Sequence, residues 1–172
     1  MKTEIIEQDG FYIVGISVRT SNQNGQSKKD IDELWFKFMD DNLIKHIPDR
    51  ASNDVYCVYT DYETDHTGKY TAVLGCKVNS LTNINSNFTA VAISAGKYQV
   101  YSLKNKLSEV ISAAWQQIWE SDINRKYTAD FDLYSSGANE HGMKISLAIN
   151  QLVYLVKLNL LPGMPSFSLL LL

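Results

Sequence analysis

The sequence has few cysteines and histidines, and these shortages narrow the class of protein. Only two cysteines occur among 172 residues, too few for a secreted scaffold held together by disulfides. Cys57 and Cys76 fall on two strands of one expected hairpin, with no histidine near them in sequence. We therefore expect small, buried, reduced side chains and no metal centre or other cofactor. His46, His66 and His141 lie in polar loops without HxH or HExxH spacing, and we interpret them as surface residues.

An excess of positive charge and a long apolar run are also missing. The net charge is −3, and the basic side chains are scattered, which argues against nucleic acid as the main partner. The N-terminal sequence MKTEIIEQDG is polar and does not resemble a signal peptide. The apolar run 152–161 is shorter than the ~20 residues that a membrane span needs. We therefore expect a cytoplasmic protein that does not cross a membrane.

Aromatic residues are the most informative part of the composition. The chain has 45% hydrophobic and 20% charged residues, as in an ordinary globular domain, and is long enough to bury a sizeable core. It also has ten Tyr, six Phe and three Trp. Tyr and Trp combine a large apolar face with a polar group, which suits both ligand pockets and amphipathic sheet faces.

The most unusual pattern lies in RKYTADFDLYSS, residues 125–136. In a strand, Phe131 and Leu133 point to one face while Asp132 and Tyr134 point to the other. Aspartate is depleted in strands. A carboxylate two residues from a phenol indicates either a solvated sheet face or a site where a polar or cationic group meets the sheet, and the pattern alone leaves both open.

The periodicity of the chain predicts two successive sets of strand, helix, strand and strand. In the first set, strands are expected at 11–19, 55–62 and 70–79. The helix between them begins after Asp30, an N-cap that forms a capping box with Glu33. Its apolar stripe consists of Ile31, Leu34, Trp35, Phe38 and Met39.

The second set repeats this order. Residues 88–103 predict a strand pair or one bent strand broken at Ala95-Gly96, and strands are also expected in 125–136 and at 144–149. The helix expected from Ser108 to Ser121 has an apolar stripe of Val110, Ile111, Ala114, Trp115, Ile118 and Trp119, in which we expect Trp119 only to pack.

The two sets align residue by residue as well as element by element. Trp35 matches Trp115, Tyr59 matches Tyr134, and Cys57 matches Asp132. Two copies of a small unit usually pack about a pseudo-twofold axis, and the groove between them is a natural concave site. We therefore expect the two tyrosines to face each other there, with Asp132 as the acid that breaks the symmetry.

Several of these segments resemble a known family. The pieces YTDYE at 59–63, GKY at 96–98, AW at 114–115 and the DFDLY strand are similar to the GyrI-like effector-binding domain. That domain is the ligand-sensing half of AraC-type and multidrug-responsive regulators. The resemblance covers about residues 4–150 and is nearest to the stand-alone integron-associated effector-binding proteins. It leaves no room for a DNA-binding half, so we expect no direct DNA binding.

The resemblance implies an α+β fold of two βαββ halves, about 1–80 and 87–150, with a curved antiparallel sheet carrying two helices. It also implies an aromatic cleft for amphipathic or cationic drugs, with a buried acid as counter-charge. That acid falls on Asp132, one methylene shorter than the usual Glu. Both helix tryptophans also suit the core, and Tyr98 also suits a sheet edge. The expected ligand-binding residues are Asp132, Tyr134, Tyr59, Trp115, Trp35 and Tyr98.

A lipophilic cation that leaves water needs apolar surface around it and one compensating negative charge. It also gains ~0.5–2 kcal/mol from a cation–π contact with each ring face. If Asp132 is buried, we expect its pKa to be raised in the empty protein and the carboxyl to ionise as a cation binds.

Two other functions stay open at this point. Some relatives in this superfamily resemble small hydrolases, in which Asp132 would act as general base and Tyr134 as donor to the leaving oxygen. The superfamily also includes an inhibitor of a protein partner, a topoisomerase. The Leu-rich tail 151–172 lies beyond the resemblance, and we interpret it as a packing or homodimerisation element.

Overall fold

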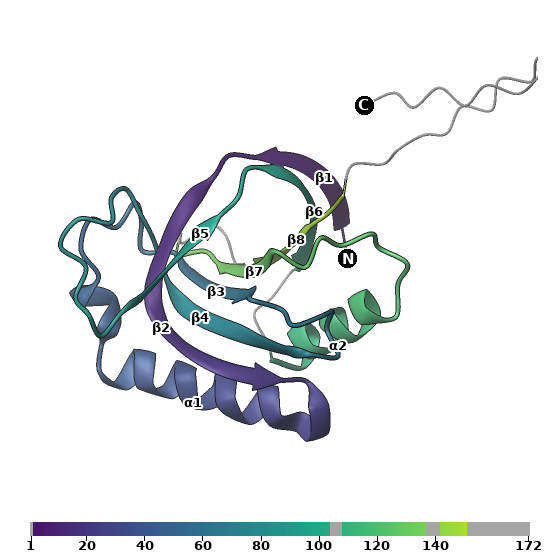
Figure 1. The fold of residues 1–172 in the computed structure, drawn as a ribbon, viewed down its shortest axis with the longest axis horizontal. Helices are drawn as coiled ribbons and strands as arrows, with labels where there is room; N and C mark the ends of the chain where they lie inside the picture. Colours follow the sequence, from purple (N-terminus) through teal and green to yellow (C-terminus); the bar gives the residue numbers. More distant parts are fainter. Residues whose placement is uncertain (1, 104–107, 137–141, 151–172) are drawn as a thin grey trace, which may run out of the picture.

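The computed structural model describes residues 2–103, 108–136 and 142–150, and shows one antiparallel sheet with two helices (Figure 1). This is the α+β fold that the sequence and the resemblance predict. Short 3-10 helices lie at Gln23–Gly25 and Leu43–His46. The strands and helices are β1 (Lys2–Gln8), β2 (Phe11–Ser21), α1 (Gln26–Asp40), β3 (Val55–Thr60), β4 (Lys69–Val78), β5 (Thr89–Ile93), β6 (Gly96–Leu103), α2 (Ser108–Trp119), β7 (Ala129–Tyr134) and β8 (Met143–Ala148).

The sheet curls on itself because its two outermost strands continue into strands on the opposite side. The strand order is β1-β6-β8-β7-β3-β4-β2-β5. Strand β1 pairs with β6, and β2, which follows β1 after two residues, pairs with β5. Two long bent strands therefore run antiparallel to each other and close the curl, as Figure 1 shows.

The pairing of β3 with β7 places the two halves about a pseudo-twofold axis. Cys57 and Asp132, which match each other in the alignment of the halves, are also direct cross-strand partners. Each central strand is flanked by the corresponding strands of its own half, β4 and β2 on one side and β8 and β6 on the other. The axis therefore passes between Cys57 and Asp132. At this point the first half has a thiol and the second half has a carboxylate.

Alternation along the strands divides the core in two. One cluster packs between the sheet and the helices, and includes Trp115 and Ile145. The other cluster fills the inside of the curl, and includes Phe11, Tyr98 and Phe131. Both cysteines are buried in the first cluster and are free thiols.

Three details of the elements differ from the predictions. Strand β1 was not expected, since its residues are polar and mostly exposed. The capping box was wrong, because α1 begins at Gln26 and Asp30 lies inside the helix, where its carboxylate accepts hydrogen bonds from Thr20 Oγ1 (2.6 Å) and Gln26 Nε2 (2.7 Å). Met39 is 66% exposed, because the buried stripe is centred on Leu34 and Phe38.

The tail 151–172 and His141 lie outside the described residues, and the expected domain limits stay predictions. Within the described part of the chain, neither helix is long and apolar enough to cross a membrane.

Candidate functional site

A cavity of about 810 Å³ opens between α1 and α2 over the central strands. Its walls come from both helices, from β3 and β7, and from the loop between β3 and β4. Five of the six expected ligand-binding residues line it: Asp132, Tyr134, Tyr59, Trp115 and Trp35.

Asp132 lies at the floor of this cavity and is 0% exposed. Its carboxylate accepts hydrogen bonds from Tyr59 Oη at 2.8 Å and from Trp115 Nε1 at 3.2 Å. Tyr134 Oη adds a longer contact of 3.5 Å. These donors come from β3, α2 and β7, so the pairing of the two halves brings them together.

Burial dominates the electrostatics of this floor. It raises the pKa of Asp132 to about 7, although the hydrogen bonds from Tyr59, Trp115 and Tyr134 oppose the rise. Burial beside the carboxyl also raises the pKa of Tyr59 and of Tyr134 well above the ordinary range. Of the two possibilities that the strand pattern left open, the solvated face is therefore excluded, and the pKa of Asp132 is shifted in the direction expected for a buried carboxyl.

A second carboxylate, Asp130, points to the same side of β7 but has a different environment. It forms a buried ion pair with Arg125, with Nη2 at 2.5 Å from Oδ2. It also accepts hydrogen bonds from Tyr62 Oη (3.1 Å) and from the Ala148 backbone N–H (2.9 Å). Among the described residues Asp132 has no such cationic partner, since all of its donors are neutral.

Several aromatic rings belong to the wall above Asp132. Tyr59 meets Trp115 edge to face with the ring centroids 5.1 Å apart, and Trp35 meets Tyr134 in the same way at 4.9 Å. The two tryptophans occupy matching positions of the two helices, so the repeat supplies one to each side of the cavity.

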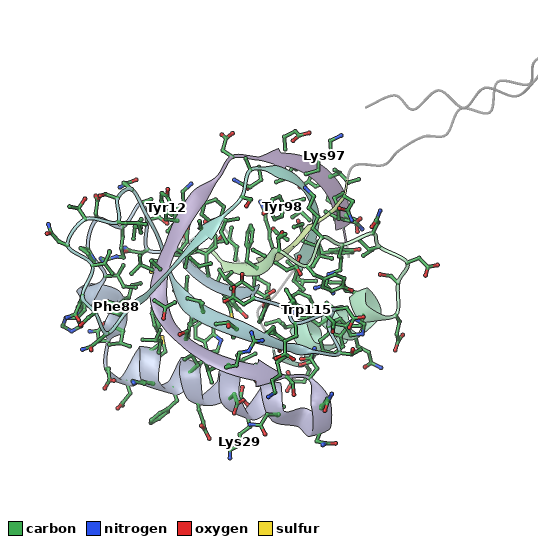
Figure 2. All side chains as sticks on the ribbon, in the orientation of Figure 1. Tyr12, Lys29, Phe88, Lys97, Tyr98 and Trp115 are labelled. Carbon is green, nitrogen blue, oxygen red and sulfur yellow. The ribbon has the colours of Figure 1, made fainter. Side chains whose placement is uncertain are left out.

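Tyr98 is the exception, and its expected place beside the other five was wrong. Its side chain belongs to the cluster inside the curl, and its hydroxyl donates to the Ser94 carbonyl at 3.0 Å. Figure 2 shows Tyr98 within the curl of the sheet, whereas Trp115 lies beside α2. Alternation along β6 turns this side chain away from the helices, and the motif GKY contains no information on that direction.

Part of the wall consists of residues that the sequence did not predict to lie there. His66, interpreted as a surface residue, lines the cavity, and so does Trp119, expected only to pack. Tyr62 and Tyr70 line it too, at the two ends of the loop that contains His66. The repeated tyrosines around the polar turn were the only available sign that this loop lies at the cavity. Periodicity could not place the loop, because it shows the direction of side chains only within helices and strands. Nowhere among the described residues do three or more His, Cys, Asp or Glu gather as metal ligands.

A family model described as integron-associated effector binding protein matches residues 4–149. The chain belongs to this family. Among solved structures, the chain is similar to the integron cassette protein VCH_CASS2 from the mobile metagenome of Vibrio cholerae. The two are 28% identical, with a TM-score of 0.66 over 86% of this chain and 95% of that one. The family resemblance noted in the sequence is thereby confirmed.

More distant structures share the fold. SAV2435 bound to tetraphenylphosphonium is 14% identical, with a TM-score of 0.72 over 87% of this chain and 94% of that one. The C-terminal domain of EcmrR is 11% identical, with a TM-score of 0.55 over 88% of this chain and 98% of that one. No curated protein sequence matches the chain.

Proposed function

We propose that this effector-binding protein captures lipophilic cations carrying a single charge in the cavity between α1 and α2. The observation that carries the proposal is the uncompensated acid at the floor: Asp132 is fully buried, and no described cation pairs with it. A buried carboxylate without a cationic partner among the described residues either takes up a proton or pairs with a cation that approaches it.

The contrast with Asp130 supports a ligand role for Asp132. Arg125 already compensates the charge of Asp130, so that carboxylate completes the structure without a ligand. The hydroxyls and the indole N–H around Asp132 stabilise its anion but bring no positive charge. The ionised floor therefore keeps one net negative charge, which a monocation neutralises.

The walls suit the rest of such a ligand. A volume of about 810 Å³ lies within the usual ~300–1,000 Å³ of small-molecule sites. Because Tyr59, Trp115 and Tyr134 cover the carboxyl, a cation meets their rings first and the charge of Asp132 behind them. The tetraphenylphosphonium complex of SAV2435, which has the same fold, further supports this ligand class.

The hydrolase alternative has less support. A general base must reach the proton that it removes directly or through one water. Asp132 is covered by three donors and is fully buried, which favours a role through charge rather than through proton transfer to a substrate. The open cavity also favours a small-molecule ligand over a protein partner for this face.

The proposal is tested by titrating tryptophan fluorescence with tetraphenylphosphonium. Two unit charges roughly 5 Å apart interact by about 3 kcal/mol at an effective dielectric constant of about 20. We therefore expect Asp132→Asn to weaken binding by about tenfold to a hundredfold.

Asp32 provides the matched control, since it also lines the cavity but is exposed and paired with Lys28 at 2.8 Å. The same acid-to-amide change, Asp32→Asn, should alter the affinity by less than about threefold, as for exposed charges in general. Equal affinity in the wild type and Asp132→Asn would remove Asp132 from the site.

A further inference from the structure

The loop between β3 and β4 brings His66 to one end of the cavity. Its imidazole stacks on the Trp119 ring, with the ring centroids 5.8 Å apart and the planes only 5° from parallel. Both residues are among those that line the cavity. The stacked pair thus contributes ring surface and an imidazole to this end of the cavity.

The backbone around His66 is fixed by contacts with the segment that precedes α1. The Asn22 side chain donates from Nδ2 to the His66 carbonyl at 2.8 Å, and Gln23 Nε2 donates to the Thr67 carbonyl at 3.3 Å. Asp65 accepts from the Thr67 backbone N–H at 2.8 Å, which tightens the turn. The position of the ring therefore follows from main-chain contacts and from stacking on Trp119.

The imidazole itself keeps unused hydrogen-bonding capacity. Its Nδ1 atom is enclosed and has no hydrogen-bond partner in the part of the chain that the structure describes, and its Nε2 atom is not enclosed and bonds no described residue. Buried polar atoms are normally paired, and an unpaired one costs free energy. Of the two ring nitrogens, Nε2 is therefore the one that a ligand in the cavity can meet.

A row of rings connects this end of the cavity with the acid at the floor. Trp115 donates to Asp132, its ring centroid lies 6.3 Å from that of Trp119, and Trp119 stacks on His66. The anionic floor and the imidazole are therefore separated by two ring-to-ring steps along one wall.

We propose that His66 and Trp119 form a second subsite, which binds an uncharged aromatic ring carrying a hydrogen-bonding group. This inference rests on the proposed function and names the ligand class more closely. The preferred ligand is an elongated cation, with its charge toward Asp132 and a hydroxyl or amine two ring lengths away at His66.

A matched pair of probes tests the inference: 4-(4-hydroxyphenyl)benzyltrimethylammonium and 4-phenylbenzyltrimethylammonium, which differ only in the hydroxyl. Affinities are measured by calorimetry for the wild type and for His66→Phe, which keeps a ring on Trp119 but removes both nitrogens. The wild type should bind the hydroxylated probe about threefold to tenfold more tightly, as expected for one net hydrogen bond. In His66→Phe this ratio should fall to about one, while the affinity for the plain biphenyl probe changes less than about threefold.

A second readout does not depend on the variant. With ¹⁵N-labelled histidine, the hydroxylated probe should shift the His66 ring nitrogen resonances, and the plain probe should not. A wild-type ratio near one, or a ratio that persists in His66→Phe, would overturn the subsite. If the plain probe still binds in a way that requires Asp132, only the subsite fails. If neither probe nor tetraphenylphosphonium binds the wild type, the proposed function fails with it.

Discussion

Asp130 and Asp132 lie two residues apart on the same side of β7, and their neighbours give them different roles. Arg125 holds Asp130 in an ion pair. Asp132 receives only neutral hydrogen bonds, and burial raises its pKa to about 7. In the proposed function, a cation would therefore compete with a proton for this carboxylate near neutral pH. Binding should strengthen as the pH rises through about 7, because the ionised form is the one that attracts the ligand.

Tyr59→Phe tests this competition at the residue scale. The substitution removes the shortest hydrogen bond to the carboxylate, one that lowers the pKa of Asp132. A hydrogen bond to a charged group contributes ~1.5–3 kcal/mol, or about one to two pH units. We expect the midpoint of the pH dependence of tetraphenylphosphonium binding to move upward by about one unit.

Tyr70→Phe is the matched control for this change. Tyr70 also lines the cavity and meets Tyr59 edge to face, but its hydroxyl donates to Asn22. The midpoint should stay where it is in the wild type. An unmoved midpoint in Tyr59→Phe would show that this hydrogen bond does not set the charge of the floor.

The residues of the site could be predicted from the sequence only where a strand or a repeat fixed their direction. Alternation in DFDLY places Asp132 and Tyr134 on one face, and the match of the two halves adds Tyr59 and the two tryptophans. His66 could not be found in this way, because its position depends on hydrogen bonds from a distant segment to its loop. The ion pair that neutralises Asp130 also depends on a residue outside the strand pattern.

At the scale of elements, the curl of the sheet requires a close approach between β2 and β4. Gly15 and Gly75 are direct cross-strand partners. A Cβ atom added to Gly75 would lie 2.1 Å from the Val14 carbonyl oxygen, and one added to Gly15 would lie 2.0 Å from that of Leu74. These backbone atoms cannot move aside without separating the strands, so glycine is needed at both positions.

Gly75→Ala should therefore destabilise the fold by about 3 kcal/mol, as expected for overpacking against backbone. Urea denaturation followed by circular dichroism measures the change. Ala92→Val, at an exposed position of β5, the other neighbour of β2, serves as the control. It should stay within about 0.5 kcal/mol of the wild type. A similarly small effect of Gly75→Ala would mean that the sheet does not need this close approach.

The elements that the sequence predicted well are those with a strong period. Both helices and the central strands are found near their expected positions, since each buries an apolar face. Strand β1 has no such face, because it lies at the end of the strand order and is mostly exposed. The direction of the Tyr98 side chain depends on how the whole sheet curls. A local sequence pattern does not show that curl.

At the scale of the whole molecule, closure of the sheet leaves the cavity on one side only of the described sheet. The inside of the curl is filled by its own apolar cluster, so the cavity lies on the helix side, where the two halves meet. Burying Asp132 there has a cost. Because the pKa of Asp132 is raised on folding, the stability contributed by its protonated form is complete below pH 4 and is lost as the pH rises through about 7. In the proposed function, a bound cation would restore that stability by neutralising the charge.

The exchange of a proton for a cation is the central claim, and calorimetry measures it directly. Tetraphenylphosphonium is titrated into the protein at pH 6.5 in two buffers with different enthalpies of ionisation. We expect the release of between about half and one proton per cation bound, since most of the Asp132 carboxyl is protonated at that pH. Asp132→Asn should bind more weakly and release none. Binding by the wild type without proton release, or equal release from the variant, would contradict the account.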